Sequence, residues 1–170
     1  MDLQDTLTRA SSALTKEGIS FALIGGFALA AHGVVRATQD IDLLVDGAMK
    51  ERAQRTLVSA GFKIVHETAE VVHLSGNAQL DILYSNREPT RQMIREAKKT
   101  NGFPVPVVSA EGIIGLKIQA YKNDSRREFQ DKADIQALME TCVDLDFKKI
   151  KNYADVFDEW PFILELKAKL

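Results

Sequence analysis

Three aspartates in this chain have the residue type and the neighbours expected of a metal-binding site. Asp40 and Asp42 stand in the run Gln-Asp-Ile-Asp-Leu-Leu-Val, and Asp81 stands in Gln-Leu-Asp-Ile-Leu-Tyr. Both runs are otherwise apolar and are typical of buried β-strands, where an uncompensated carboxylate is costly. The three carboxylates therefore indicate a divalent cation that would neutralise their charge.

Strand periodicity places two of the three carboxylates together. Side chains alternate between the faces of a strand, so Asp40 and Asp42 point to one side. Mg²⁺, or Mn²⁺ in its place, selects hard oxygen ligands and usually binds through a few carboxylates and substrate phosphates. In the alternative reading, Asp40 ends a loop, Asp42 pairs with Arg36, and Asp81 caps a hairpin. Three acids in two apolar strands favour the metal site.

The pair Gly25-Gly26 lies between a short apolar run, 20–24, and an alanine-rich segment, 27–32. A strand, a glycine turn and a helix in this order let backbone N–H groups approach a phosphate. A strand-to-helix junction can equally contain glycine only because the turn needs it. The glycine pair alone leaves both interpretations open.

Hydrophobic periodicity and turn residues predict the elements that would position these residues. Helices are expected at 2–17, 27–32, 48–60 and 87–100, and strands at 20–24, 40–45, 62–66, 71–75 and 79–84. The proline-containing segment 103–108 is expected to be extended at an edge of the sheet. From residue 109 the pattern is helical, at 109–121, at 126–140 and in pieces to Leu170. The expected fold class is α/β (α+β), a mixed β-sheet core flanked by helices, with a helical C-terminal lobe.

Length and composition limit the architecture and the partners. The 170 residues, 45% of them hydrophobic, suffice for one compact unit, with a core at 1–108 and the helical lobe, 109–170, packed on it. The formal net charge of −2 indicates no general attraction to nucleic acid or membranes. No apolar run approaches the roughly 20 residues of a membrane span. The single cysteine, Cys142, suits a reducing cytoplasm, so we expect a cytoplasmic protein without a membrane partner.

The order of these motifs resembles that of the nucleotidyltransferase superfamily typified by DNA polymerase beta. Thirteen residues separate Gly25-Gly26 from Asp40-Ile41-Asp42, and a later strand carries a third aspartate between apolar residues. The runs Leu-Ile-Gly-Gly-Phe-Ala-Leu-Ala and Arg-Ala-Thr-Gln-Asp-Ile-Asp-Leu-Leu-Val are similar to those of AbiEii-type, toxin-associated bacterial nucleotidyltransferases. This resemblance covers residues 20 to about 140.

The resemblance implies a metal-dependent enzyme that moves a nucleoside monophosphate from a nucleoside triphosphate (NTP) to an acceptor, usually a hydroxyl, with release of pyrophosphate. It implies that Gly25 and Gly26 form the phosphate-holding turn, and that Asp40, Asp42 and Asp81 are the metal-binding and catalytic carboxylates. Asp81 could also accept the proton of the acceptor. Gly26 stands where one variant of the family has serine, so phosphate holding would depend more on backbone N–H groups.

Three further residues are candidates for nucleotide binding. Arg36 and Thr38 lie in the loop before the first acidic strand, where a guanidinium could neutralise triphosphate charge and a hydroxyl could orient the turn. A plain ion pair between Arg36 and Asp40 is the alternative. Lys117 lies in an apolar helical stretch, and similar proteins have a lysine there that reaches the phosphates; it could instead extend its stem to water.

Several weaker signals remain. Tyr121 is expected in the interior rather than against a base. The charges of 126–135 are expected to join the helical lobe to the sheet, with phosphate binding by Arg127 or Lys132 as the lesser alternative. The histidines His66 and His73 lack metal-ligand spacing and are expected at the surface. The basic residues near 91–99 repeat at helical spacing, which could serve RNA but is more typical of a solvated face.

The acceptor and the partners stay open. A tRNA end, a protein hydroxyl and a small antibiotic are all compatible acceptors for the NTP-derived group. The resemblance implies a possible antitoxin protein as partner. The alternative function is a non-catalytic nucleotide-binding or antitoxin-like module with the same fold, against which the three clustered carboxylates argue.

Overall fold

The structure, a computed structural model, describes residues 2–100 and 102–170 of the chain. The chain divides into two compact units. The first contains the described residues up to Ala28 together with Arg36–Val108, and the second contains Leu29–Val35 and Ser109–Leu170. No helix within the described ranges is long and apolar enough to cross a membrane.

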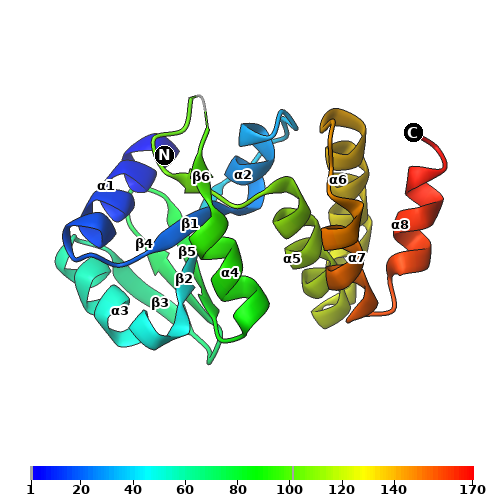
Figure 1. The fold of residues 1–170 in the computed structure, drawn as a ribbon. Coiled ribbons are helices and arrows are strands. Elements are labelled where there is room, and N and C mark those ends of the chain that lie inside the picture. Colours follow the sequence, from blue (N-terminus) through cyan, green and yellow to red (C-terminus); the bar gives the residue numbers. More distant parts are fainter. Residues whose placement is uncertain (1, 101) are drawn as a thin grey trace. The chain divides into compact units, whose positions relative to one another are not determined.

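The first unit is built on a mixed sheet, which confirms the predicted fold class (Figure 1). The strand order is β3-β4-β5-β2-β1-β7-β6, in which β2 pairs with β5 and β1 with β7 in parallel, and the other pairs are antiparallel. The strands are β1 (Phe21–Ile24), β2 (Asp40–Asp46), β3 (Lys63–Glu67), β4 (Val71–Ser75), β5 (Gln79–Ser85), β6 (Lys98–Lys99) and β7 (Pro106–Val107).

The central strands β2 and β5 carry much of the core of this unit. Ile41, Leu43 and Ile82 are fully buried, as the apolar character of both runs predicts. The strand β3, at one end of the sheet, is exposed along its whole length. The aspartates therefore lie in the middle of the sheet, where register is strongly fixed by the buried neighbours.

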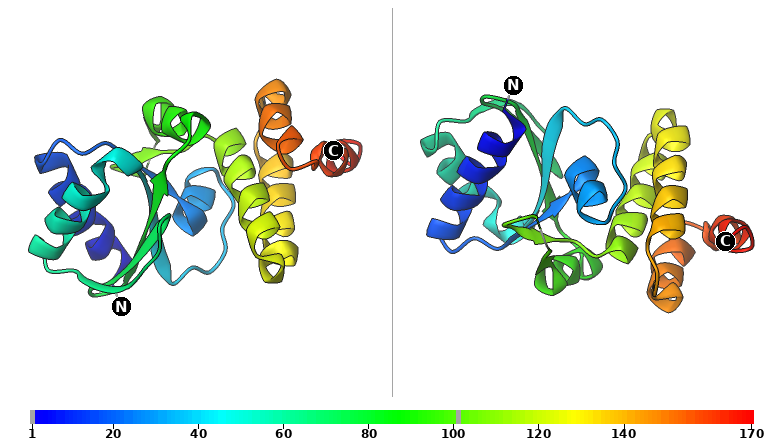
Figure 2. Two further views of the ribbon diagram at one scale, coloured as in Figure 1. Left: turned by 90° about the horizontal axis from the view of Figure 1, so that it is seen from below. Right: turned by 90° about the horizontal axis from the view of Figure 1, so that it is seen from above.

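Helices cover both faces of the sheet. Their bounds are α1 (Leu3–Lys16), α2 (Gly25–Ala31), the 3₁₀ turn η1 (Gly47–Met49), α3 (Lys50–Ser59) and α4 (Glu88–Glu96). Figure 2 shows α1 and α3 side by side on one face of the sheet. On the opposite face, Arg91 of α4 contacts Asp46 at 3.2 Å, and Thr90 lies 2.8 Å from Ser85, hydroxyl to hydroxyl. Asp46 points to the same face of β2 as Asp42, and we call this face of the sheet the aspartate face. The contact between Arg91 and Asp46 therefore places α4 on the aspartate face.

The second unit is helical. It contains α5 (Ala110–Asn123), the 3₁₀ turn η2 (Ser125–Arg127), α6 (Glu128–Thr141), α7 (Phe147–Asp155) and α8 (Trp160–Lys167). Ser109 caps the N-terminus of α5, where its hydroxyl accepts a hydrogen bond from the Gly112 N–H, and α5 packs against α6 and α7 (Figure 2). A β-carbon at Gly115 would lie 2.7 Å from Cγ of Tyr153, so the glycine allows α5 and α7 to approach closely.

Two predictions for residues 87–108 were wrong. The helix ends at Glu96, because Ala97 has extended backbone angles and Lys98–Lys99 pair as β6. The basic side chains near 91–99 therefore do not share one helical face. The strand β7 is not at the edge, since it lies between β1 and β6. Pro106 is tolerated there because Val107, rather than the proline, pairs with Leu23 of β1.

Candidate metal and nucleotide site

The parallel pairing of β2 with β5 brings the three aspartates together. In this register Asp42 stands beside Asp81, and Asp40 stands beside Gln79. One carboxylate oxygen from each of Asp40, Asp42 and Asp81 lies within 4.8 Å of the others, and all three residues are half-buried. Carboxylates this close repel one another strongly unless a cation neutralises them.

The donor set fits a divalent cation of the Mg²⁺ type. All three groups offer hard oxygen ligands on adjacent, buried strands, and they stay partly open on the aspartate face. Other triads of His, Cys, Asp or Glu with comparable spacing do not occur in the described ranges. The site is therefore a candidate for one or two ions held by Asp40, Asp42 and Asp81.

The two glycines leave room for the polar residues of the site. Gly25 follows β1 directly and has a φ of +65°, and a β-carbon there would lie 2.6 Å from Cγ of Asp42. A β-carbon at Gly26 would lie 2.7 Å from Cβ of Thr38. Both approaches are closer than a real β-carbon tolerates, so glycine is required for the turn to fit against Asp42 and Thr38. This steric role was not foreseen from the sequence, and it leaves the predicted phosphate role open.

The loop that enters β2 supplies the next contacts. The hydroxyl of Thr38 donates a hydrogen bond to Oδ1 of Asp40 at 2.8 Å. A guanidinium N–H of Arg36 donates to the Ala37 carbonyl at 2.9 Å. Thr38 therefore orients a carboxylate of the triad, while the nucleotide-binding role of Arg36 and Thr38 stays a prediction.

Asp81 has two polar neighbours on the same sheet. The side-chain amide of Gln79 donates to both of its carboxylate oxygens, at 3.1 and 3.2 Å. Nδ1 of His73 lies 2.8 Å from Oδ1 of Asp81. The surface assignment predicted for the two histidines holds for His66, which is exposed, but His73 contacts the triad. The alternation of side chains along β4 could not predict this contact. The contact depends on the pairing of β4 with β5, which the sequence of β4 alone does not determine.

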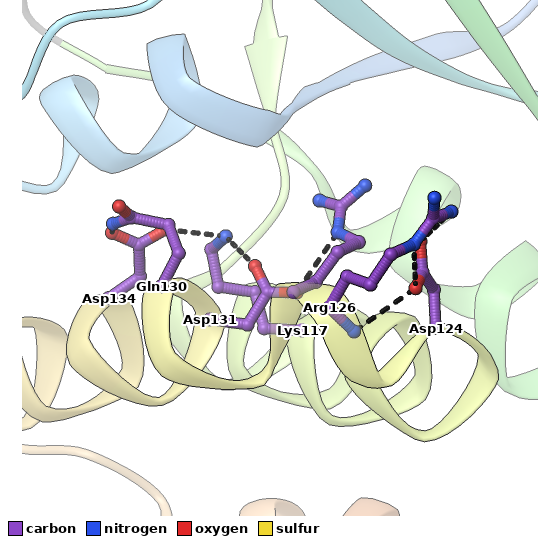
Figure 3. Close-up of polar contacts among 7 residues, drawn as sticks. Lys117, Asp124, Arg126, Gln130, Asp131 and Asp134 are labelled. Atoms are coloured by element: carbon purple, nitrogen blue, oxygen red, sulfur yellow. Dashed lines mark hydrogen bonds and ion pairs between the residues drawn. The ribbon is translucent and has the colours of Figure 1, made fainter.

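Lys117 lies in the second unit in a buried ionic cluster (Figure 3). Its ammonium group is 2.8 Å from Asp131 Oδ1 and 2.6 Å from Asp134 Oδ2, and its side chain is 7% exposed. Arg127 adds a 3.1 Å hydrogen bond to Asp131. The alternative to nucleotide binding, in which the lysine stem extends to water, is therefore wrong, and the nucleotide contact of Lys117 stays a prediction.

The other charged and aromatic candidates of this unit have local partners. Tyr121 is 3% exposed, so the prediction of an interior position is confirmed, and burial raises the pKa of its hydroxyl. Lys132 donates a 2.6 Å hydrogen bond to Glu128, one turn earlier in α6. Arg127 contacts Asp131, and Lys132 also lies over the rings of Tyr121 and Phe162, all within the second unit.

Known structures share this fold. The antibiotic-resistance factor ANT(2'')-Ia, solved in solution, is 19% identical, with 96% of this chain and 95% of that chain covered and a TM-score of 0.65. The lincosamide antibiotic adenylyltransferase LnuA, solved with lincomycin, is 18% identical over 82% of this chain and 98% of that chain, with a TM-score of 0.58. A putative nucleotidyltransferase from Thermotoga maritima is 19% identical over 76% and 88%, with a TM-score of 0.50.

No curated protein matches the sequence at a significant level. Residues 9–167 match the family described as "Nucleotidyl transferase AbiEii toxin, Type IV TA system". This match spans nearly the whole chain, both units included, and it agrees with the resemblance that the glycine and aspartate motifs indicate. The chain therefore belongs to the AbiEii nucleotidyl transferase family.

Proposed function

We propose that this protein transfers a nucleoside monophosphate from an NTP to a hydroxyl acceptor and releases pyrophosphate, with Mg²⁺ bound by Asp40, Asp42 and Asp81. The observation that supports the proposal most directly is the convergence of the three carboxylates within 4.8 Å in the middle of the sheet. Membership in a nucleotidyl transferase family supports the same reaction class.

The residues of the first unit have separate tasks in this reaction. When bound, a pair of divalent ions would neutralise the triphosphate and lower the pKa of the attacking hydroxyl. Asp40 and Asp42, on one face of β2, would hold the metal together with Asp81. Asp81 would also take up the proton that the hydroxyl loses. The hydroxyl oxygen then forms the new bond to the α-phosphorus as the bond to pyrophosphate breaks.

The phosphates need donors as well as cations. Backbone N–H groups at Gly25 and Gly26 are proposed to bind the triphosphate, because no side chain blocks an approach there. Arg36 is proposed to neutralise part of the triphosphate charge. Thr38 acts through Asp40, to which it donates a hydrogen bond. Lys117 is proposed to bind phosphate as well.

The acceptor and the partner follow from weaker arguments. A tRNA end, a protein hydroxyl and a small antibiotic are the acceptor classes to test, and a net charge of −2 disfavours a large RNA slightly. The toxin description of the family supports an antitoxin protein as partner. A cytoplasmic location is proposed from the family and from the single cysteine.

The test uses the purified chain with Mg²⁺ and each of the four α-labelled NTPs in a cell extract. Label is expected in one class of acceptor, RNA, protein or small molecule, together with release of pyrophosphate. Asp42→Asn should lower the rate by on the order of a thousandfold, because it removes one of the proposed metal ligands.

Asp46→Asn is the matched control. It removes a carboxylate from the same face of the same strand, outside the triad, and asparagine can keep the cap that Asp46 forms with the N–H of Ala48. This variant should transfer label at the wild-type rate. Equal rates for Asp42→Asn and the wild type, or no label from any NTP in any acceptor, would contradict the proposed function.

A further inference from the structure

A row of polar side chains crosses the sheet at the level of the triad. The antiparallel pairing of β4 with β5 places His73 beside Asp81, and the pairing of β3 with β4 places His66 beside His73. Asp42 is the next member of the row beyond Asp81. Directly paired residues point to the same face, so this row is Asp42, Asp81, His73 and His66.

His73 is in direct contact with the triad. Its Nδ1 atom is buried and lies 2.8 Å from Oδ1 of Asp81, whose side chain is 15% exposed. The described residues provide no aligned hydrogen-bond partner for this nitrogen, so the Asp81 carboxylate is its polar neighbour. An ionised carboxylate only accepts hydrogen bonds, and the contact is therefore favourable when Nδ1 carries the proton.

We propose that His73 is a positioning residue for the metal site and that it acts by holding the Asp81 carboxylate. This inference rests on the proposed metal binding by the triad. His73, on the neighbouring strand β4, and Gln79, on the same strand β5, both contact the Asp81 carboxylate. Together they restrict its rotation, so that its oxygens stay directed to the site that Asp40 and Asp42 share.

The size of the effect follows from known metal sites. Groups that contact and orient a metal ligand typically change metal affinity or activity by about 10–100-fold when they are removed. The side chain of His66 stacks on that of His73, with ring centroids 5.9 Å apart and planes 19° apart. His66 lies on β3, one strand further from Asp81 than His73, so a change at His66 provides a comparison.

The test measures the affinity of the purified chain for Mn²⁺ by calorimetry, without nucleotide and independently of activity. His73→Leu should weaken Mn²⁺ binding by about 10–100-fold. His73→Asn should restore most of the affinity, because its amide nitrogen is attached at Cγ as Nδ1 is. His73→Gln, whose amide reaches one bond further, should not restore it. His66→Leu should bind Mn²⁺ like the wild type.

Each outcome decides the inference. Wild-type affinity in His73→Leu, or equal losses in His73→Asn and His73→Gln, would overturn it, and so would a wild-type chain that binds no Mn²⁺. If His73→Leu does not fold, as judged by thermal unfolding in EDTA, the comparison of the Asn and Gln variants still decides. A wild-type chain that binds Mn²⁺ but transfers no nucleotide would contradict only the proposed function, and the affinities would still test His73.

Discussion

Gly25 is the residue at which local backbone and site geometry depend most directly on each other. Its φ of +65° is unfavourable for residues with a side chain, and a β-carbon would also meet Asp42. Gly18 has almost the same φ, +66°, but nothing lies within 4 Å of the position of its β-carbon. A substitution at Gly18 therefore measures the loss of stability from the backbone conformation alone. A substitution at Gly25 measures that loss together with the loss from crowding against Asp42.

Gly18→Ala should lower the free energy of unfolding by about 1–2 kcal/mol, the usual cost of a left-handed residue with a side chain. Gly25→Ala should cost more, because the methyl group also displaces the Asp42 carboxylate or the turn. It should in addition weaken Mn²⁺ binding, whereas Gly18→Ala should not. Urea unfolding and calorimetry measure the two quantities. Equal losses of stability with unchanged Mn²⁺ affinity would contradict the steric role of Gly25.

At the scale of elements, the buried ionic cluster joins α5 to α6. Lys117 comes from α5, and its partners Asp131 and Asp134 come from successive turns of α6 (Figure 3). All three side chains are almost fully buried. Removal of one partner from a buried ion pair is costly, because the remaining charge is left without compensation in a poorly solvated position.

Lys117→Met should therefore destabilise the chain by about 3–5 kcal/mol. The matched control is Lys122→Met, which removes a lysine of the same helix whose partner, Glu159, is 2.8 Å away in a more exposed pair. Its effect should be too small to resolve, because exposed pairs contribute little. Urea unfolding compares the two variants. A similar small loss in both would show that the cluster is not a structural link, and the rate per folded molecule would test the nucleotide role of Lys117 separately.

At the scale of the whole molecule, two buried tyrosines limit stability at high pH. Burial raises the pKa of Tyr84 in the first unit from 10.0 to about 12, and burial also raises the pKa of Tyr121 in the second unit. In the folded chain each hydroxyl keeps its proton at a pH where the unfolded chain has lost it. The folded state then binds more protons, so the free energy of unfolding falls as the pH rises above 10.

Tyr84→Phe should flatten this decline between pH 10 and about 12. At pH 7 the titration of Tyr84 should contribute nothing to the free energy of unfolding, because the folded and the unfolded chain both keep the proton there. Urea unfolding from pH 7 to 12 measures both effects. A steeper decline in the variant than in the wild type would contradict the assignment.

Local sequence determined much of the fold. Alternation of side chains predicts that Asp40 and Asp42 share one face of a strand. Glycines predict the ends of α1 and α3 to within two residues of the helix ends in the structure. Periodicity wrongly predicted that residues 98–99 belong to a helix, because these two lysines continue the basic pattern of the preceding helix. In the structure they pair with β7 as the strand β6. A two-residue strand is too short to have a period of its own.

Tertiary structure decided which of these residues meet. Asp81 joins Asp40 and Asp42 because β5 pairs with β2 in parallel, although β3 and β4 come between them in the chain. The antiparallel register of β4 with β5 brings His73 to Asp81, and the packing of α5 on α6 surrounds Lys117 with two aspartates. A side-chain period is a property of a few neighbouring residues, so the sequence by itself determines it. Strand order, register and helix packing depend on the burial of side chains from distant segments, which only the folded chain brings into contact.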